Sequence, residues 1–349
     1  MRTRTRHYQQ SLFLIIGLAV AAVAAGVFLA YCTEYAPWGY SDSAAYFSAA
    51  RNLASGHSLG VSTVNGGTTP FNLQAPLYPL ILAVFARFDI NLIPAARVMN
   101  ITLWTLFVFL CGWLFYCITG RQVEAFCFEV MCAFSAPLVE AFSGLMSEPL
   151  ALFLGIPGFL LLILAVTRRS TLWMVLAALM IGFSVLTRFA FAAILAGGVL
   201  VVLVFSDLPW QRRWINTLMF GVIGIAPMGI FTLVQRIQRV TTGGRSLVFN
   251  EVSSKLRDFA SMVWNTLKYW LPYRSNMIPG VSAKYFAPLL ALALTALVGI
   301  GLLVFIRMER KGVLKDPAFI LAVSSILFIL AYFGVLLGGF AFSSVSNDI

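Results

Sequence analysis

Nine apolar runs constrain this chain more than any other feature of its sequence. They cover roughly residues 11–31, 95–118, 125–142, 148–166, 171–187, 189–205, 214–234, 285–306 and 317–341. A helix needs about 20 apolar residues to cross the hydrocarbon core of a bilayer. Only 11% of the residues are charged, whereas soluble domains carry about 25%. The sequence therefore predicts an all-α, polytopic membrane protein with about nine transmembrane helices.

The basic residues predict how these spans are oriented. With the N-terminus inside, twelve of the 24 Lys and Arg residues fall in five short cytoplasmic segments: Arg2, Arg4, Arg6, Arg121, Arg168, Arg169, Arg212, Arg213, Arg307, Arg310, Lys311 and Lys315. Short loops rich in Lys and Arg remain in the cytoplasm. We expect a multi-pass protein of the plasma (inner) membrane with a cytoplasmic N-terminus. The net charge of +11 then reflects topology and contact with membrane lipids, and we expect no nucleic-acid partner.

The predicted organisation has two parts. Residues 1–234 form a transmembrane module that includes a first external loop, 32–94, and residues 235–349 hold a second external loop and the last spans. The second loop contains a predicted amphipathic helix at 252–271. In the first loop, the segment 74–88 is apolar for only about 15 residues, so we expect it to lie in the membrane interface. The chain ends directly after the last predicted span, which we interpret as a minimal or truncated architecture.

The first external loop is unusually long and polar. Loops longer than about 12–15 residues are functional or disordered, and its aromatic residues argue against disorder. Asp42 is the only acidic residue between Glu34 and Asp89. It either caps the helix predicted at 42–55 or acts in a site at the membrane surface. His57 lies in a Gly/Ser bend, where a solvated side chain is the simpler interpretation.

Three more charged residues are predicted to lie on the same face of the membrane. Glu148 opens the fourth span, where it or Ser147 could cap the helix ahead of Pro149. Arg188 separates two apolar runs, and an arginine at membrane depth indicates function, with phosphate binding as its natural use. A side chain that extends to the interface from a tight turn is the alternative for Arg188. Arg97, which opens the second span, allows the same two interpretations.

Several short motifs resemble one family of membrane enzymes. Tyr46 is followed by Ala50, a Leu-x-x-Gly bend ends at Gly56, and the sequence APLYPL occupies positions 75–80. With Asp42 upstream, this pattern resembles the first external loop of GT-C-type glycosyltransferases. The closest groups are the relatives of protein O-mannosyltransferases and of the lipid A aminoarabinose transferase. The motifs Ser-Glu-Pro-Leu at 147–150 and Leu-Thr-Arg at 186–188 also match, so the resemblance covers about residues 1–205.

The resemblance implies a GT-C-like fold and transfer of a sugar from a polyprenyl-phosphate donor to a lipid, glycan or protein acceptor. The roles it implies are a catalytic carboxylate at Asp42, donor-phosphate binding by Arg188 and Arg97, and further site residues at Glu148, His57 and Tyr78. Such chemistry needs a base for the acceptor hydroxyl and positive charge beside the leaving phosphate. The site would face the extracytoplasmic side.

A divalent cation, Mg²⁺ or Mn²⁺, is a further expectation, with Asp42 and Glu148 as its ligands. Ser43 follows Asp42 where some relatives carry a second acid, which leaves metal dependence open. The five cysteines show no metal-like spacing, and the chain has only two histidines, so no zinc site is expected.

Two other functions are compatible with the sequence. A multi-pass transporter or lipid flippase would need charged groups or broken helices within its spans, and Glu129 is the exception among nearly uncharged spans. A truncated, non-catalytic relative is the other alternative. Replacement of Asp42 separates the enzyme from this non-catalytic relative, because only the enzyme should lose turnover while keeping its fold.

Overall fold

The structure is a computed structural model that describes residues 2–63, 67–71, 74–237, 261 and 316–342. The chain divides into two compact units, one of residues 1–244 with 321–332 and the other of residues 245–320 with 333–349. Several predicted features lie outside the described residues. They are most of the second loop, its helix at 252–271 apart from Ser261, and the span at 285–306.

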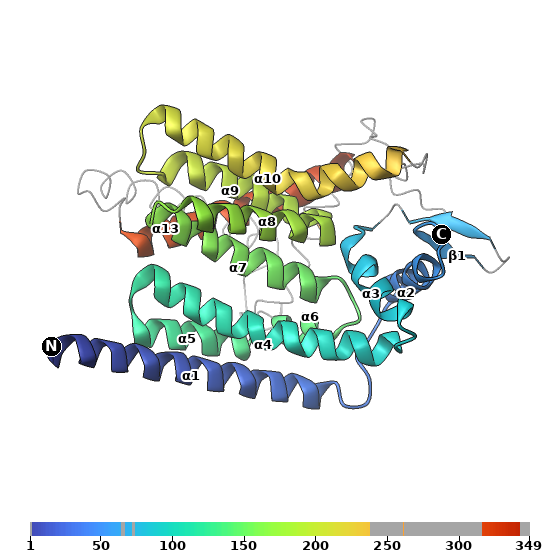
Figure 1. The fold of residues 1–349 in the computed structure, drawn as a ribbon, viewed down its shortest axis with the longest axis horizontal. Helices are drawn as coiled ribbons and strands as arrows, with labels where there is room; N and C mark the ends of the chain where they lie inside the picture. The colour runs from blue at the N-terminus through green and yellow to red at the C-terminus, as the bar shows by residue number, and fades with distance from the viewer. Residues whose placement is uncertain (1, 64–66, 72–73, 238–260, 262–315, 343–349) are drawn as a thin grey trace, which may run out of the picture. The chain divides into compact units, whose positions relative to one another are not determined.

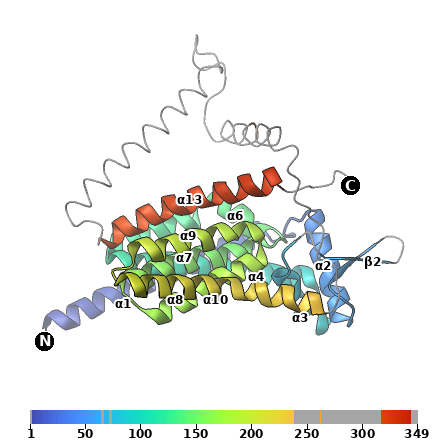
Figure 2. The same cartoon turned by 90° about the horizontal axis from the view of Figure 1, so that it is seen from above.

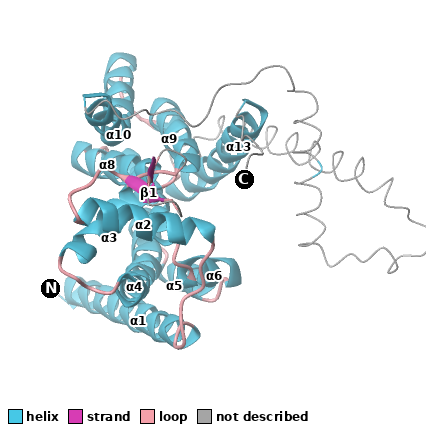
Figure 3. Cartoon of the chain, turned by 90° about the vertical axis from the view of Figure 1, so that its right-hand side faces the viewer, coloured by secondary structure: helices cyan, strands magenta, loops and turns pink. Residues whose placement is uncertain are grey.

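The described elements are helices apart from one short hairpin (Figures 1 and 3). The helices are α1 (Arg2–Cys32), α2 (Ser41–Ala54), α3 (Leu77–Arg87), α4 (Leu92–Thr119), α5 (Gln122–Ala133), α6 (Ala136–Ser143), α7 (Glu148–Thr167), α8 (Thr171–Thr187), the 3₁₀ turn η1 (Phe189–Phe191), α9 (Ala192–Phe205), α10 (Trp210–Ile237) and α13 (Pro317–Phe342). The strands are β1 (Gly60–Ser62) and β2 (Thr68–Pro70), which pair in antiparallel register with Val61 opposite Thr69.

Four of the described helices are long and apolar enough to cross a membrane: Leu12–Cys32, Leu92–Thr119, Glu148–Thr167 and Trp210–Arg236. A fifth span is possible if α5 and α6, which meet at an angle of 53°, are counted as one broken helix. These five correspond to predicted spans. α8 and α9 are apolar but shorter. The prediction of a helical membrane protein is therefore supported, while the number nine stays a prediction.

The long helices of the first unit pack side by side, with α7 at the centre (Figures 1 and 2). α7 contacts α4 on one side and α8 on the other, while α1 packs on α4 and α10 on α8. In the most apolar 18-residue stretch of each helix, 72% is buried in α7 and 22% in α10. A helix that is apolar on all sides belongs in an interior, which explains why α7 takes the central place.

The predicted helices of the first loop both form, and they pack on each other. α2 covers 41–54, as predicted to within one residue, and α3 begins directly after Pro76. With 11 residues, α3 is only about 16 Å long, too short for a span. Its apolar face is covered by α2 and the first turns of α4 through a small core that includes Tyr46, Tyr78 and Leu82. The loop is thus a folded unit with its own core.

The hairpin β1–β2 was not expected from the sequence, which predicted only a polar bend there. It forms because α2 supplies hydrogen bonds to it. The Ser62 amide donates to Ser48 Oγ (2.8 Å), and Asn52 Nδ2 donates to the Gly60 carbonyl (2.8 Å). Both contacts join side chains on successive turns of α2 to one strand, so the strand is fixed by its neighbour rather than by its own short, Gly- and Thr-rich sequence.

Candidate functional site

The loop between α1 and α2 is tied to the turn between α6 and α7. The Leu145 amide donates to the Trp38 carbonyl (2.8 Å), and Trp38 Nε1 donates to the Glu140 carbonyl (3.1 Å). Asn100 of α4 donates through Nδ2 to the Gly144 carbonyl (2.7 Å) and is buried. These bonds hold the start of α2 beside the start of α7, two points about 100 residues apart in sequence.

Asp42 lies in the first turn of α2, half-buried, but it does not cap the helix. The helix begins at Ser41 with Tyr40 in the capping position, and the Tyr40 amide donates to Ser43 Oγ (3.0 Å). The carboxylate of Asp42 instead accepts a hydrogen bond from Gln74 Nε2 (3.1 Å). An acidic group in the first turn is favoured by the helix dipole. Asp42 is therefore held in place by Gln74, and its carboxylate keeps acceptor capacity beyond that bond.

One turn further along α2, Tyr46 forms the link to α7. Its hydroxyl and that of Ser147 are 3.1 Å apart, and both residues are buried, with 3% and 1% of their surfaces exposed. Ser147 precedes α7 but makes no side-chain cap on it. The interpretation of Ser147 as a helix cap is therefore wrong for its side chain, because that hydroxyl is used to bind Tyr46.

Glu148 and Arg188 form an ion pair. Arg188 lies between α8 and η1 in an extended conformation (φ −155°, ψ 118°), which ends α8 and directs the chain into the next turn. Its Nη1 contacts Glu148 Oε1, and the two side chains are 42% and 26% exposed. Among the described residues, Glu148 Oε2 is buried without a hydrogen-bond partner. The pair joins the first turn of α7 to the end of α8.

The charges of Asp42, Glu148 and Arg188 all influence the Tyr46 hydroxyl. Burial raises the pKa of the Tyr46 hydroxyl, and the hydrogen bond with Ser147 lowers it. The carboxylates of Asp42 and Glu148 raise the same pKa further, while the Arg188 guanidinium lowers it. Because all three charges act on one hydroxyl, the structure brings together three residues that are far apart in sequence. Two carboxylates and one guanidinium make a site that can accept a proton and bind an anion.

Tyr78 belongs to the same cluster. Its ring packs edge-on against Tyr46 with centroids 5.1 Å apart, and it is fully buried in α3. Burial, then the proximity of Tyr46 and Glu148, raises the pKa of its hydroxyl well above the usual value. No described residue hydrogen-bonds to that hydroxyl.

The other two predicted site residues lie elsewhere. Arg97 of α4 uses its guanidinium on α1, with Nε donating to Thr33 Oγ1 (3.1 Å) and Nη2 to the Ala30 carbonyl (2.8 Å). This contact stabilises the end of α1 by satisfying a carbonyl of its last turn. His57 is exposed in the bend after α2, and no contact among the described residues joins it to Asp42 or Glu148.

The resemblance implies a divalent cation on Asp42 and Glu148, and the oxygens present allow a limited test. Glu148 Oε1 contacts Arg188 and Asp42 Oδ1 contacts Gln74, so Glu148 Oε2 and Asp42 Oδ2 are the oxygens that such a cation would use. Among the described residues, no cluster of three His, Cys, Asp or Glu could hold a metal. Mg²⁺ takes six oxygens and retains several waters. Cation binding stays a prediction, and we assign the metal no step.

Sequence reasoning missed the residues that position the charged ones. Gln74, Tyr46 and Ser147 had no predicted role in the site, although Tyr46 and Ser147 belong to the motifs that carry the resemblance. Each makes its contact between segments that are distant in the sequence: Gln74 and Ser147 lie just before α3 and α7 and both reach α2. No periodicity or spacing in the sequence reports such contacts.

Comparison with protein-family models gave no match, and neither did comparison with curated proteins or with solved structures. The fold and the site described above therefore carry the functional argument.

Proposed function

We propose that this chain is a GT-C-like glycosyltransferase of the plasma membrane, with about nine spans and a cytoplasmic N-terminus. It transfers a sugar from a polyprenyl-phosphate donor to an acceptor hydroxyl at the extracytoplasmic face. The observation that carries the proposal is that the contact between Tyr46 and Ser147 joins the first turns of α2, where Asp42 lies, to the start of α7, where Glu148 pairs with Arg188. A lipid-linked donor would reach a site at the end of membrane-spanning helices without leaving the bilayer.

In this reaction Asp42 takes the proton of the acceptor hydroxyl. The acceptor oxygen attacks the anomeric carbon of the sugar, and the bond between that carbon and the phosphate oxygen breaks. The electron pair leaves with the phosphate, and Arg188 stabilises its charge. Nη1 of Arg188 contacts Glu148, and its remaining donors have no partner among the described residues. Glu148 thus orients the guanidinium, and Gln74 orients the base.

The first test measures transfer of radiolabelled sugar from polyprenyl-phosphate donors by membranes that contain wild type or Asp42→Asn. General base catalysis contributes about 10²–10⁴-fold, so we expect a loss of about 100-fold or more in Asp42→Asn. Asp89→Asn is the matched control, since Asp89 is an exposed acid in the same loop, at the end of α3. Equal transfer by wild type and Asp42→Asn would exclude the assigned base. Absence of transfer from every donor would reject the activity itself.

One observation favours the alternative of a transporter or flippase. Glu129 of α5 is fully buried, and neither carboxylate oxygen has a hydrogen-bond partner among the described residues. It lies in the pair of helices that meet at 53°. An ionisable group at membrane depth commonly marks a transport path. If the chain is a transporter or flippase, Asp42→Asn should leave transport unchanged and Glu129→Gln should abolish it. These two variants therefore distinguish a transporter from a glycosyltransferase.

A further inference from the structure

At the end of the bundle opposite the candidate site, a polar cavity of about 200 Å³ lies between the α7–α8 and α9–α10 turns. α7 has 20 residues and is therefore about 30 Å long, so this cavity is separated from Glu148 by the length of a membrane span. Its polar lining consists of Arg169, Ser170, Thr171, Ser206, Asp207, Arg212 and Asn216. The proposed sugar transfer uses none of these residues.

The two arginines in the cavity differ in their partners. Arg169 forms an ion pair with Asp207, which neutralises that carboxylate. Arg212, in the first turn of α10, is exposed and makes no ion pair or hydrogen bond to any described residue. Among the described residues that line the cavity there are two arginines and one carboxylate, an excess of one positive charge. A guanidinium with its donors free is suited to phosphate oxygens.

Backbone geometry adds donors to the same cavity. α8 begins at Thr171, and the Ser170 side chain does not cap it. The amides of its first turn therefore keep hydrogen-bonding capacity and a partial positive charge. α10 packs on α8 and also begins here, so two helix N-termini open beside one cavity. Such N-termini bind anions.

Ser206 is an independent indication of a ligand. It lines the cavity, only 5% of its surface is exposed, and its hydroxyl has no hydrogen-bond partner among the described residues. Its hydroxyl is open to the cavity, so it can hydrogen-bond to a group held there. A phosphate oxygen in the cavity would supply the missing partner, together with the donors of Arg212 and the α8 amides.

Two tryptophans indicate where the phosphate comes from. Trp210 and Trp214 lie in the first turns of α10, the helix that contributes Arg212 to the cavity; they are 62% and 42% exposed, with ring centroids 5.4 Å apart. Exposed tryptophan is enriched at the level of lipid head groups. We propose that this cavity binds the phosphate head group of an anionic phospholipid, through Arg212, Ser206 and the N-terminus of α8.

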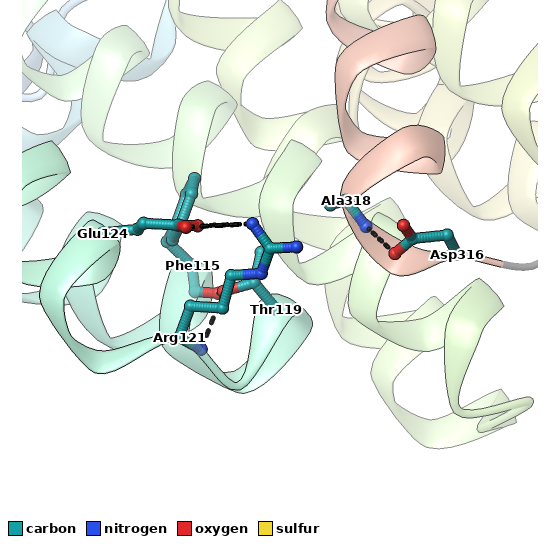
Figure 4. A network of polar contacts seen from close by, with 6 residues as sticks. All are labelled: Phe115, Thr119, Arg121, Glu124, Asp316 and Ala318. Carbon is teal, nitrogen blue, oxygen red and sulfur yellow. Dashed lines mark hydrogen bonds and ion pairs between the residues drawn. The ribbon is translucent and has the colours of Figure 1, made fainter.

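The test counts bound lipid by native mass spectrometry of the purified full chain, titrated with phosphatidic acid or with phosphatidylcholine. We expect one phosphatidic acid to bind tightly, and Arg212→Gln to raise its Kd about tenfold, as expected for loss of a charged hydrogen bond. Arg121→Gln is the matched control. Arg121 lies at the same end of the bundle, and its guanidinium is already paired with Glu124 (2.9 Å; Figure 4).

Equal weakening by Arg212→Gln and Arg121→Gln would overturn the proposal, because it would indicate diffuse surface charge. Unchanged affinity in Arg212→Gln would overturn it as well. If Arg212→Gln does not elute as a folded protein, Ser206→Ala carries the test, with an expected severalfold rise in Kd. Competition by inorganic phosphate separates the sources: displacement of the lipid at similar concentration assigns a free-phosphate site, and no displacement assigns the lipid head group.

Discussion

Tyr46 connects the parts of the candidate site, although tyrosine in a helix carries no functional signal by itself. Its ring packs against Phe71 and Tyr78, and its hydroxyl bonds with Ser147, the residue before Glu148. Asp42 precedes it by one helical turn. Tyr46 is thus one of the contacts that position Asp42 relative to the ion pair of Glu148 and Arg188, together with the Trp38 bonds to the turn before α7.

Tyr46 and Tyr78 share one core, but loss of the hydroxyl should lower the stability of the protein only at Tyr46. Tyr46→Phe leaves Ser147 buried without its partner, so we expect a loss of about 1–3 kcal/mol in unfolding free energy. Tyr78→Phe removes a buried hydroxyl that has no described partner, so stability should be unchanged or higher. Thermal unfolding of the purified variants in detergent measures both.

Tyr35→Phe is the control for this pair, because Tyr35 is 98% exposed. An equal loss of stability in Tyr46→Phe and Tyr78→Phe would contradict the assigned hydrogen bonding. If Tyr78→Phe keeps its stability but loses sugar transfer, the Tyr78 hydroxyl binds substrate, as the family resemblance implies for a site residue.

The turn between α6 and α7 holds the loop between α1 and α2 on the bundle, because the Gly144 backbone lies close to the Trp38 ring. The backbones of Trp38 and Gly144 pair in a parallel β-bridge, and the Gly144 backbone lies against the Trp38 indole ring. A Cβ on Gly144 would meet ring atoms of Trp38 at 2.6 Å and 2.9 Å. Glycine is required here for space, since its φ of −89° is ordinary. The helices α2 and α7 are consequently aligned by a contact between two loops.

Gly144→Ala should disturb this alignment. We expect Trp38 to be displaced and stability to fall by about 1–3 kcal/mol, as overpacking of a tight site costs, together with reduced sugar transfer. Gly17→Ala is the matched control, because a Cβ on Gly17 in α1 meets nothing within 4 Å and alanine favours a helix. Tryptophan fluorescence and the midpoint of thermal unfolding report the change. A Gly144→Ala protein as stable and active as Gly17→Ala would show that the bridge does not position α2.

The first unit of the molecule has two chemically different ends. One carries the folded loop with Asp42, Glu148 and Arg188, and the other carries the basic turns with Arg121, Arg168 and Arg212. Arg168 Nη2 donates to the Cys117 carbonyl (2.9 Å), which joins the ends of α4 and α7. The two ends are separate because successive long helices run in opposite directions. The positive-inside rule predicts that the end with the basic turns faces the cytoplasm.

Labelling of single cysteines with a membrane-impermeant maleimide should distinguish these ends. We expect Ser58→Cys to react in intact cells and Gln211→Cys only after permeabilisation. Both positions are exposed. The background carries Ser in place of the five native cysteines, of which Cys32 and Cys127 are exposed and Cys117 is half-buried. The reverse labelling pattern would invert the predicted orientation and place Asp42 in the cytoplasm.

The sequence by itself determined the helical class, the long spans and the helices of the first loop. These features depend on the length and spacing of apolar residues, which are local properties of the chain. It also singled out Asp42, Glu148 and Arg188, because isolated charges beside apolar runs are conspicuous. What it did not determine was which of them meet. The structure joins Arg188 to Glu148 and assigns Arg97 to α1, although both arginines begin or end apolar runs in the same way. Only the packing of α7 between α4 and α8, and the bonds that hold α2 on α7, decide this, because contacts between distant segments depend on how whole helices fit together.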